Sequence, residues 1–244
     1  MTALLEACLN GSRTPAEHPG IPRTPDELAT DARAAVEAGA SVLHLHPYDD
    51  AGAETLAAEP CAAAVRAVRA ACPGTPISLS TSEGIEPDPR RRMQLIAGWR
   101  EQPDLVTANQ GEAGIAELCD FLIGRGVGIE AGLLTLADAS LFVSTGIANR
   151  CVRVLVEPLD AEPAAALAHA EAMEKVLLDA AIDLEQVHHG DGLATWHVVA
   201  RAVARGYGIR AGLEDSTVLP DGQLAAGNGA LVRVAAEMLQ RGPR

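Results

Sequence analysis

The sequence has few aromatic and few basic residues. Phe, Trp and Tyr make up 2% of the 244 residues although 48% are hydrophobic, so a core must be packed mainly from aliphatic side chains. Lys and Arg number 19 against 33 Asp and Glu, which gives a formal net charge of −14. This charge repels phosphate backbones and argues against a nucleic-acid partner, while a local Arg or a metal can still bind a small anion.

The sequence also lacks long apolar runs and paired cysteine motifs. No segment approaches the roughly 20 apolar residues that a membrane-spanning helix needs, and no basic region followed by an apolar stretch suggests a signal peptide. The cysteines are odd in number and have no CxxC spacing, a pattern typical of reduced, buried thiols. We therefore expect a cytoplasmic protein without a membrane partner. The five cysteines are Cys8, Cys61, Cys72, Cys119 and Cys151.

One unit recurs along the whole chain: a short apolar run, a polar loop, and a stretch rich in Ala, Leu, Arg and Glu with helical spacing. Alternating strands and helices indicate a parallel sheet. Eight such pairs within 244 residues favour a single (β/α)₈ TIM barrel spanning residues 1–244. The alternative is an open doubly wound sheet, which a GxGxxG fingerprint after the first strand would support; the segment there reads Asn10-Gly11-Ser12-Arg13.

The strands are expected at 3–9, 41–47, 76–81, 104–108, 126–131, 151–157, 185–189 and 208–213. The helices are expected near 25–38, 58–71, 88–101, 112–125, 135–145, 162–180, 194–205 and 228–240.

In a barrel of this kind, catalytic groups lie at the C-terminal ends of the strands and in the loops that follow. The second strand ends with His44 and His46, which share one face because strand side chains alternate. Leu43 and Leu45 would pack against helices, so both imidazoles point into the barrel. Two neutral imidazoles in adjacent layers suit a metal such as zinc. The alternative is a pair of core histidines hydrogen-bonded to their neighbours.

The eighth strand contributes a second group. Arg210, Gly212 and Glu214 are expected on one face, and with that face inward Gly212 leaves space for a ligand between two charged side chains. Asp215 follows on the loop. Because the second and eighth strands both flank the first, Glu214 can reach the two histidines and complete a metal site. The alternative is a structural Arg–Glu ion pair with a capping Asp.

Further polar side chains gather at the ends of other predicted strands. Some of them must be helix N-caps, which favour Ser, Thr, Asp and Asn. The segment His188–Gly192 precedes a helix after the seventh strand, a usual phosphate site in this fold, although glycine there also serves a simple turn. The polar residues at the predicted strand ends are Asn10, Ser80 to Ser82, Thr107, Asn109, Glu130, Glu157 and His188 to Asp191.

These motifs resemble those of the β-keto acid cleavage enzymes, the family of the 3-keto-5-aminohexanoate cleavage enzyme. The resemblance runs essentially from end to end. It is carried by Ala7-Cys8-Leu9-Asn10-Gly11 with His18-Pro19, by Ala38-Gly39-Ala40 leading into His44-Leu45-His46, by Arg210-Ala211-Gly212-Leu213-Glu214-Asp215, and by Ala226-Gly227-Asn228-Gly229.

The resemblance implies a zinc-dependent barrel, usually a homo-oligomer, that condenses a β-keto acid with acetyl-CoA. Cleavage of the adduct gives acetoacetate and a new acyl-CoA. The family's zinc ligands fall on His44, His46 and Glu214, and its arginine and acidic base fall on Arg210 and Asp215. Its substrate-binding residues match Ser82 after the third strand and the pair Thr107 and Asn109 at the fourth.

The chain departs from the family pattern at three positions. Tyr48 stands where the family usually has Arg, and Glu83 where it tends to have glycine. Arg13 replaces an acidic residue that selects an amino-bearing substrate in the founding member, which predicts a neutral or anionic substrate tail. Two other functions stay open: another metal-dependent enzyme, a keto-acid aldolase or decarboxylase, for which the ligand set would serve equally well, and a non-catalytic metabolite-binding barrel.

Overall fold

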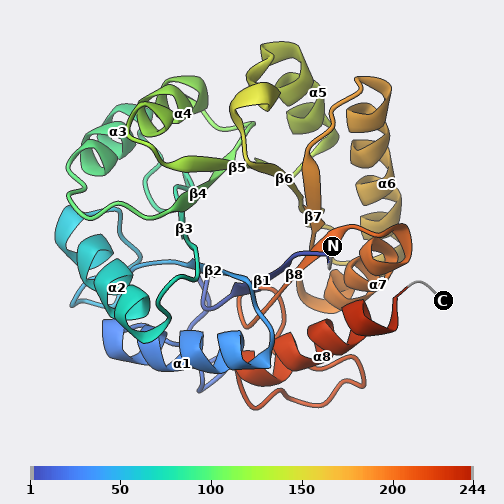
Figure 1. The fold of residues 1–244 in the computed structure, drawn as a ribbon, viewed down its shortest axis with the longest axis horizontal. Coiled ribbons are helices and arrows are strands. Elements are labelled where there is room, and N and C mark those ends of the chain that lie inside the picture. Colours follow the sequence, from blue (N-terminus) through green and yellow to red (C-terminus); the bar gives the residue numbers. More distant parts are fainter. Residues whose placement is uncertain (1–2, 243–244) are drawn as a thin grey trace.

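The computed structural model describes residues 3–242. Eight parallel strands pair in chain order, and the last pairs with the first to close a barrel that the helices surround (Figure 1). The strands are β1 (Leu5–Cys8), β2 (Val42–Leu45), β3 (Ile77–Ser80), β4 (Leu105–Asn109), β5 (Gly128–Leu133), β6 (Arg153–Val156), β7 (Glu185–His188) and β8 (Gly208–Ala211). The α-helices are α1 (Pro25–Ala38), α2 (Ala58–Ala71), α3 (Pro89–Ala97), α4 (Ile115–Gly124), α5 (Leu136–Thr145), α6 (Pro163–Asp179), α7 (Thr195–Arg205) and α8 (Asn228–Arg241).

The predicted (β/α)₈ barrel is confirmed. Pairing of β1 with β8, in which Leu5 is level with Ile209, closes the sheet and excludes the open doubly wound alternative. Each helix follows the strand after which it was expected, and most strands are a few residues shorter than their apolar runs. None of the helices in residues 3–242 is long and apolar enough to cross a membrane.

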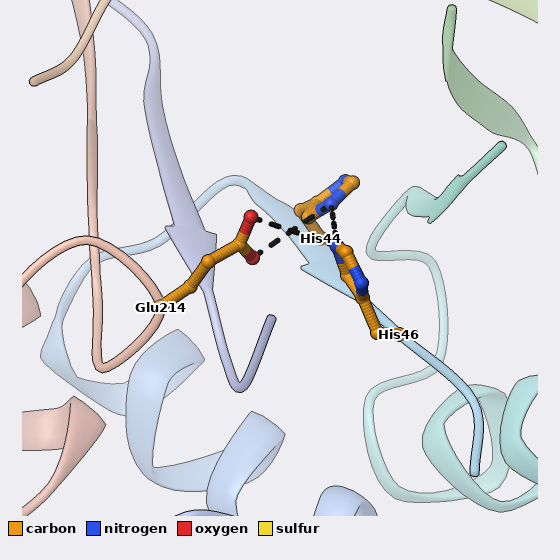
Figure 2. A group of neighbouring side chains, drawn as sticks. All are labelled: His44, His46 and Glu214. Atoms are coloured by element: carbon orange, nitrogen blue, oxygen red, sulfur yellow. Dashed lines mark hydrogen bonds and ion pairs between the residues drawn. The ribbon is translucent and has the colours of Figure 1, made fainter. Parts of the chain in front are cut away.

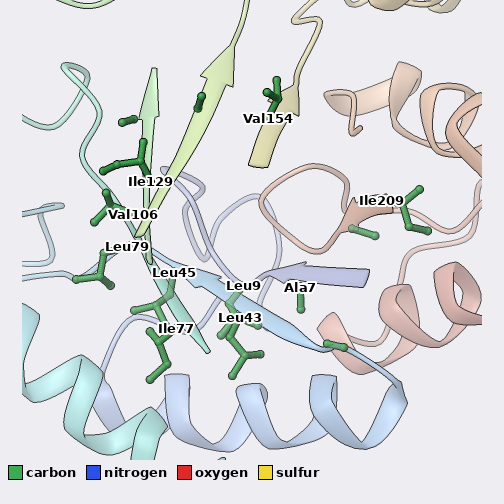
Figure 3. Packing of buried hydrophobic residues seen from close by; sticks show 14 of the residues in the cluster. Ala7, Leu9, Leu43, Leu45, Ile77, Leu79, Val106, Ile129, Val154 and Ile209 are labelled. Atoms are coloured by element: carbon green, nitrogen blue, oxygen red, sulfur yellow. The ribbon is translucent and has the colours of Figure 1, made fainter. Parts of the chain in front are cut away.

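The main core lies between the barrel and its helices. Leu43 and Leu45 of β2 are fully buried there, as their alternation with the two histidines predicted. Figure 3 shows aliphatic side chains of neighbouring strands meeting on this helix-facing side. Full burial of one such side chain stabilises the fold by about 1.5–3 kcal/mol, so a core nearly without aromatic residues is sufficient.

The inside of the barrel holds a network of buried polar side chains. Ser78 of β3 donates a hydrogen bond to Glu130 of β5, and Arg153 of β6 donates to the same carboxylate over 3.1 Å. Burial and the neighbouring Glu130 raise the pKa of the fully buried Glu6 well above its usual range. Glu6 is therefore held as a neutral acid, which lowers the cost of enclosing several charged groups in one barrel.

The segment after β8 corrects one expectation. The strand ends at Ala211, and the backbone N–H groups of Asp215 and Ser216 both bond to the carbonyl of Gly212 and form a turn. Glu214 therefore lies on a turn and not on the inward register of the strand. Gly212 does not leave space for a ligand: a Cβ there would lie 1.9 Å from the carbonyl oxygen of Cys8, so glycine permits contact between the turn and β1.

The contact at Gly212 predicts a large effect of one methyl group. We expect Gly212→Ala to destabilise the fold by about 1–3 kcal/mol, because rigid backbone must move. Gly124→Ala at the end of α4 is the matched control, since its Cβ would meet nothing within 4 Å. Denaturant unfolding of the two variants makes the comparison, and equal free energies of unfolding would contradict this role of Gly212.

Candidate active site

Three predicted residues meet at the C-terminal mouth of the barrel. His44 is in β2, His46 follows directly after it, and Glu214 reaches them from the turn after β8 (Figure 2). The two Nε2 atoms are 3.2 Å apart. Glu214 Oε1 is 3.5 Å from Nε2 of His46, and Oε2 is 3.8 Å from Nε2 of His44. The side chains thus present three ligand atoms to one point.

The spacing of these atoms fits a divalent metal. Zinc bonds of about 2.0–2.2 Å in a tetrahedron place neighbouring ligand atoms about 3.3–3.6 Å apart, close to the three observed separations. The buried Oε2 of Glu214 has no hydrogen-bond partner in the described chain, so it is available as a ligand. Three protein ligands would leave one coordination position for a substrate.

The second ring nitrogen, Nδ1, of each imidazole contacts a further side chain. His46 Nδ1 lies 2.5 Å from Oε1 of Glu54, and His44 Nδ1 lies 3.3 Å from the hydroxyl oxygens of both Ser78 and Thr107. A metal-binding histidine usually donates its second N–H to such an acceptor, which fixes the ring and leaves the other nitrogen free. Glu54 belongs to the loop after β2, and its sequence context carries no signal of this contact.

The electrostatics favour two imidazoles and one carboxylate as donors. Burial lowers the pKa of His44 well below its usual value and keeps it neutral. Burial also acts to lower the pKa of His46, but Glu214 and Glu54 outweigh it and raise the value to about 9. Burial would raise the pKa of Glu214, yet Arg210 and the two histidines hold it well below its usual range. Glu214 is therefore an anion, and a bound cation would take the place of the proton on His46.

Arg210 joins this group to Asp215. The Arg210 guanidinium donates to Oε1 of Glu214 over 2.6 Å and to Oδ1 of Asp215 over 3.3 Å. The thiol of Cys8 donates to Oδ2 of Asp215 over 2.7 Å. Asp215 lies on the turn after β8, as expected, and its side chain is only 3% exposed. The other described cysteines are also free and buried, as expected.

A cavity of about 330 Å³ opens beside these side chains. Arg13 stands in its wall and donates to the backbone carbonyl of Glu214 over 2.8 Å, and it forms ion pairs with Glu17 and Asp191, each at 3.2 Å. Larger hollows lie outside the barrel, beside α7 and α8. The lining of the inner cavity is Ser12, Arg13, Glu17, His46, Glu157, Asp191, Glu214 and Asp215.

The remaining predicted residues lie at varying distance from the metal group. Thr107 contacts His44 directly. Asn109 is two residues further along β4, and its amide donates to Glu112 over 2.8 Å. Ser82 follows β3, where its hydroxyl accepts from the N–H of Gly84 over 3.0 Å. Of these three, the structure brings only Thr107 into contact with a candidate ligand.

The fold and the site together define a parallel (β/α)₈ barrel with a candidate metal centre at its mouth. The family model described as beta-keto acid cleavage enzyme matches residues 3–174 and 160–243, well over half of the chain. The chain belongs to this family.

Relatives support the assignment along the full length. The 3-keto-5-aminohexanoate cleavage enzyme of Fusobacterium nucleatum is 28% identical over 243 residues, which covers 94% of this chain and 88% of that protein. The enzyme of the same name from Acetoanaerobium sticklandii is 26% identical over 250 residues, again covering 94% and 88%.

Solved structures confirm the fold at lower identity. A complex of ObcA with oxaloacetate has a TM-score of 0.73 at 19% identity and covers 92% of this chain. A complex of ObcA with a C4-CoA adduct and oxalate has a TM-score of 0.74 at 18% identity and covers 91%. This chain spans 65% and 64% of those two chains, respectively, so it is considerably shorter than ObcA.

The hydrogen bond behind His46 predicts an effect on metal affinity. We expect Glu54→Gln to weaken the binding of a divalent metal by about 10–100-fold, as is usual when a partner of a metal-binding histidine is lost. Glu59→Gln is the control, since Glu59 is exposed and pairs with the exposed Arg66. Competition with a metal-sensitive chelator measures both. Wild-type affinity in Glu54→Gln would show that Glu54 does not support a metal ligand.

Proposed function

We propose that this protein is a zinc-dependent enzyme that condenses a β-keto acid with acetyl-CoA and cleaves the adduct to acetoacetate and a new acyl-CoA. Membership of the β-keto acid cleavage family supports this reaction. ObcA, which shares the fold, binds oxaloacetate, itself a β-keto acid. The observation that carries the proposal is the contact of one guanidinium, that of Arg210, with both the candidate ligand Glu214 and the buried Asp215.

His44, His46 and Glu214 would hold the zinc. Two imidazoles and a carboxylate are a ligand set that catalytic zinc sites use. Bound there, the metal would act as a Lewis acid and stabilise negative charge on substrate oxygens. The residues around it have the remaining tasks of binding the substrate and moving its proton.

Asp215 is the proposed base. A carboxylate committed to a cation is a poor base, because the cation stabilises its charged form. Glu214 is therefore less suited than Asp215, which borders the cavity. Arg210 would orient Asp215 and compensate anionic charge. Thr107, Asn109 and Ser82 would bind polar groups of the substrate at β3 and β4; β4 lies opposite β8 in the barrel.

The reaction balances as an exchange of acyl groups. Asp215 accepts a proton from the carbon between the keto and carboxylate groups, and that carbon attacks the thioester carbonyl of acetyl-CoA. A carbon–carbon bond forms, and the CoA thiolate leaves. The thiolate then attacks the original keto carbon, the older carbon–carbon bond breaks, and its electron pair returns to the α-carbon. Asp215 returns the proton, which yields acetoacetate and the new acyl-CoA.

A screen of β-keto acids with acetyl-CoA, with acetoacetate as the readout, tests the proposal. Keto-acid turnover that does not need acetyl-CoA would identify an aldolase or decarboxylase instead. Metal binding without any turnover would identify a non-catalytic barrel.

We also propose a homo-oligomer, in which Leu193 and Leu224, 75% and 61% exposed here, would be covered.

The two neighbouring carboxylates should respond differently to neutralisation. We expect Asp215→Asn to keep the zinc and to lose about 10²–10⁴-fold in turnover, as for a lost general base. Glu214→Gln should lose zinc, with activity falling in proportion to occupancy. Metal analysis paired with exchange of the substrate's α-proton in deuterated water separates the two. If Asp215→Asn exchanges this proton at the wild-type rate, Asp215 is not the base.

The charged groups that line the cavity predict the charge of the substrate's tail. Its five carboxylates all have cationic partners: Glu17 and Asp191 pair with Arg13, Glu157 with His189, and Glu214 and Asp215 with Arg210. An ammonium group would find none unpaired. We therefore expect uncharged β-keto acids to be preferred over 5-amino-3-ketohexanoate.

Arg13→Ala should shift this preference a few-fold towards the amino substrate, because a partly exposed ion pair contributes about 1 kcal/mol or less. Values of kcat/KM for both substrates measure the shift. A clear preference of the wild-type protein for the amino substrate would contradict the assignment of Arg13.

A further inference from the structure

A buried histidine bridges Asp215 and the cavity wall. His189 follows directly after β7, and its side chain is 0% exposed. Its Nδ1 lies 3.4 Å from Oδ1 of Asp215, and its Nε2 lies 3.2 Å from Oε2 of Glu157. Glu157 follows β6, borders the cavity and is 18% exposed. The chain thus places an imidazole between the proposed base and a second carboxylate.

The two carboxylates account for the polar contacts of this ring. Neither ring nitrogen has a well-aligned hydrogen bond within the described chain, although both are fully enclosed. Buried polar groups rarely lack partners, and contacts that are long in a free enzyme often shorten when substrate binds. Burial and Arg210 act to lower the pKa of His189, but Glu157 and Asp215 outweigh them and raise it to about 9. The ring is a cation at neutral pH and can donate from both nitrogens.

His189 differs from the other partners of Asp215 in its second contact, which lies outside the candidate metal group. Arg210 is shared with Glu214, so its position depends on the metal group. The thiol of Cys8 contacts only Oδ2. His189 contacts Oδ1 and is fixed at its far side by Glu157, which is independent of the metal. Together these contacts hold both carboxylate oxygens, and small displacements of a reacting group can cost orders of magnitude in rate.

We propose that His189, anchored by Glu157, is a positioning residue that holds Asp215 in place for removal of the substrate's α-proton. This inference rests on the proposed function and adds a residue to it. His189 acts through Asp215 and need not touch the substrate. A purely structural role would be served as well by an apolar ring of similar size, and it would affect stability without a specific effect on proton removal.

Acetoacetate is the probe for the test, because the proposed reaction forms it whatever the other acyl group is. Exchange of its α-protons in deuterated water, measured by NMR above the uncatalysed rate, reports on the base alone. We expect His189→Leu to lower the saturating exchange rate by about 10–100-fold with little change in the half-saturating acetoacetate concentration, a loss typical of supporting hydrogen bonds. His189→Asn keeps a donor near the Nδ1 position and should recover part of the rate.

The neighbouring His188 provides a matched control. It is equally buried, but it stacks on Tyr207 with ring centroids 4.6 Å apart, outside the barrel wall. His188→Leu should keep the wild-type exchange rate. If His189→Leu does not fold, Glu157→Gln removes the anchoring charge at a partly exposed position and should lower the saturating rate several-fold. Zinc content should be unchanged in every folded variant.

The outcomes separate this inference from the proposed function. Wild-type protein that does not exchange the protons of acetoacetate would overturn both. An active wild type with an equally fast His189→Leu or Glu157→Gln would overturn only the role of His189. Equal losses in His189→Leu and His189→Asn, accompanied by a matching fall in Tm, would show a structural residue and also overturn it. A loss of rate at unchanged Tm and zinc content, with partial recovery in His189→Asn, is the expected result.

Discussion

The buried guanidinium of Arg210 is the contact on which the site depends. It is 2% exposed and pairs with Glu214 and Asp215, two adjacent carboxylates that would otherwise repel each other inside the barrel. Removing one partner of such a buried group leaves uncompensated charge and costs about 3–5 kcal/mol. By keeping Glu214 ionised, Arg210 prepares a metal ligand, and by binding Asp215 it places a second carboxylate beside it. In the proposed mechanism, metal binding and proton transfer are therefore linked through one side chain.

Most of the fold could be predicted from the sequence because one unit recurs. Apolar runs of strand length alternate with helical patterns, and a barrel of eight pairs satisfies all of them. The alternation in Leu43-His44-Leu45-His46 also fixed which face meets the helices and which enters the barrel. The turn after β8 could not be predicted in this way. Glycine at position 212 lets the turn contact the carbonyl of Cys8, which is distant in sequence, and extending the alternation to Glu214 is therefore wrong.

The candidate ligands could be predicted from the sequence. The side chains that contact them and Asp215 could not. His44, His46 and Glu214 converge because β2 and β8 both flank β1, which the barrel topology already implies. The contacts of Glu54 with His46, and of Cys8 with Asp215, join loops and strands whose relative height only the folded chain determines. The sequence identifies Cys8 as a buried thiol within a family motif, and neither property indicates its contact with Asp215. Sequence patterns report the face on which a side chain lies, and they do not report which partner it meets across a barrel.

Carbon labelling tests the central claim, the exchange of acyl groups, most directly. Acetyl-CoA with carbon-13 in both acetyl carbons is incubated with the protein and an unlabelled β-keto acid, and the acetoacetate is analysed by NMR. Condensation followed by cleavage predicts both labels side by side, in the methyl and ketone carbons, with an unlabelled methylene and carboxylate. Label in the methylene or carboxylate carbons, or consumption of the keto acid without labelled acetoacetate, would contradict the account.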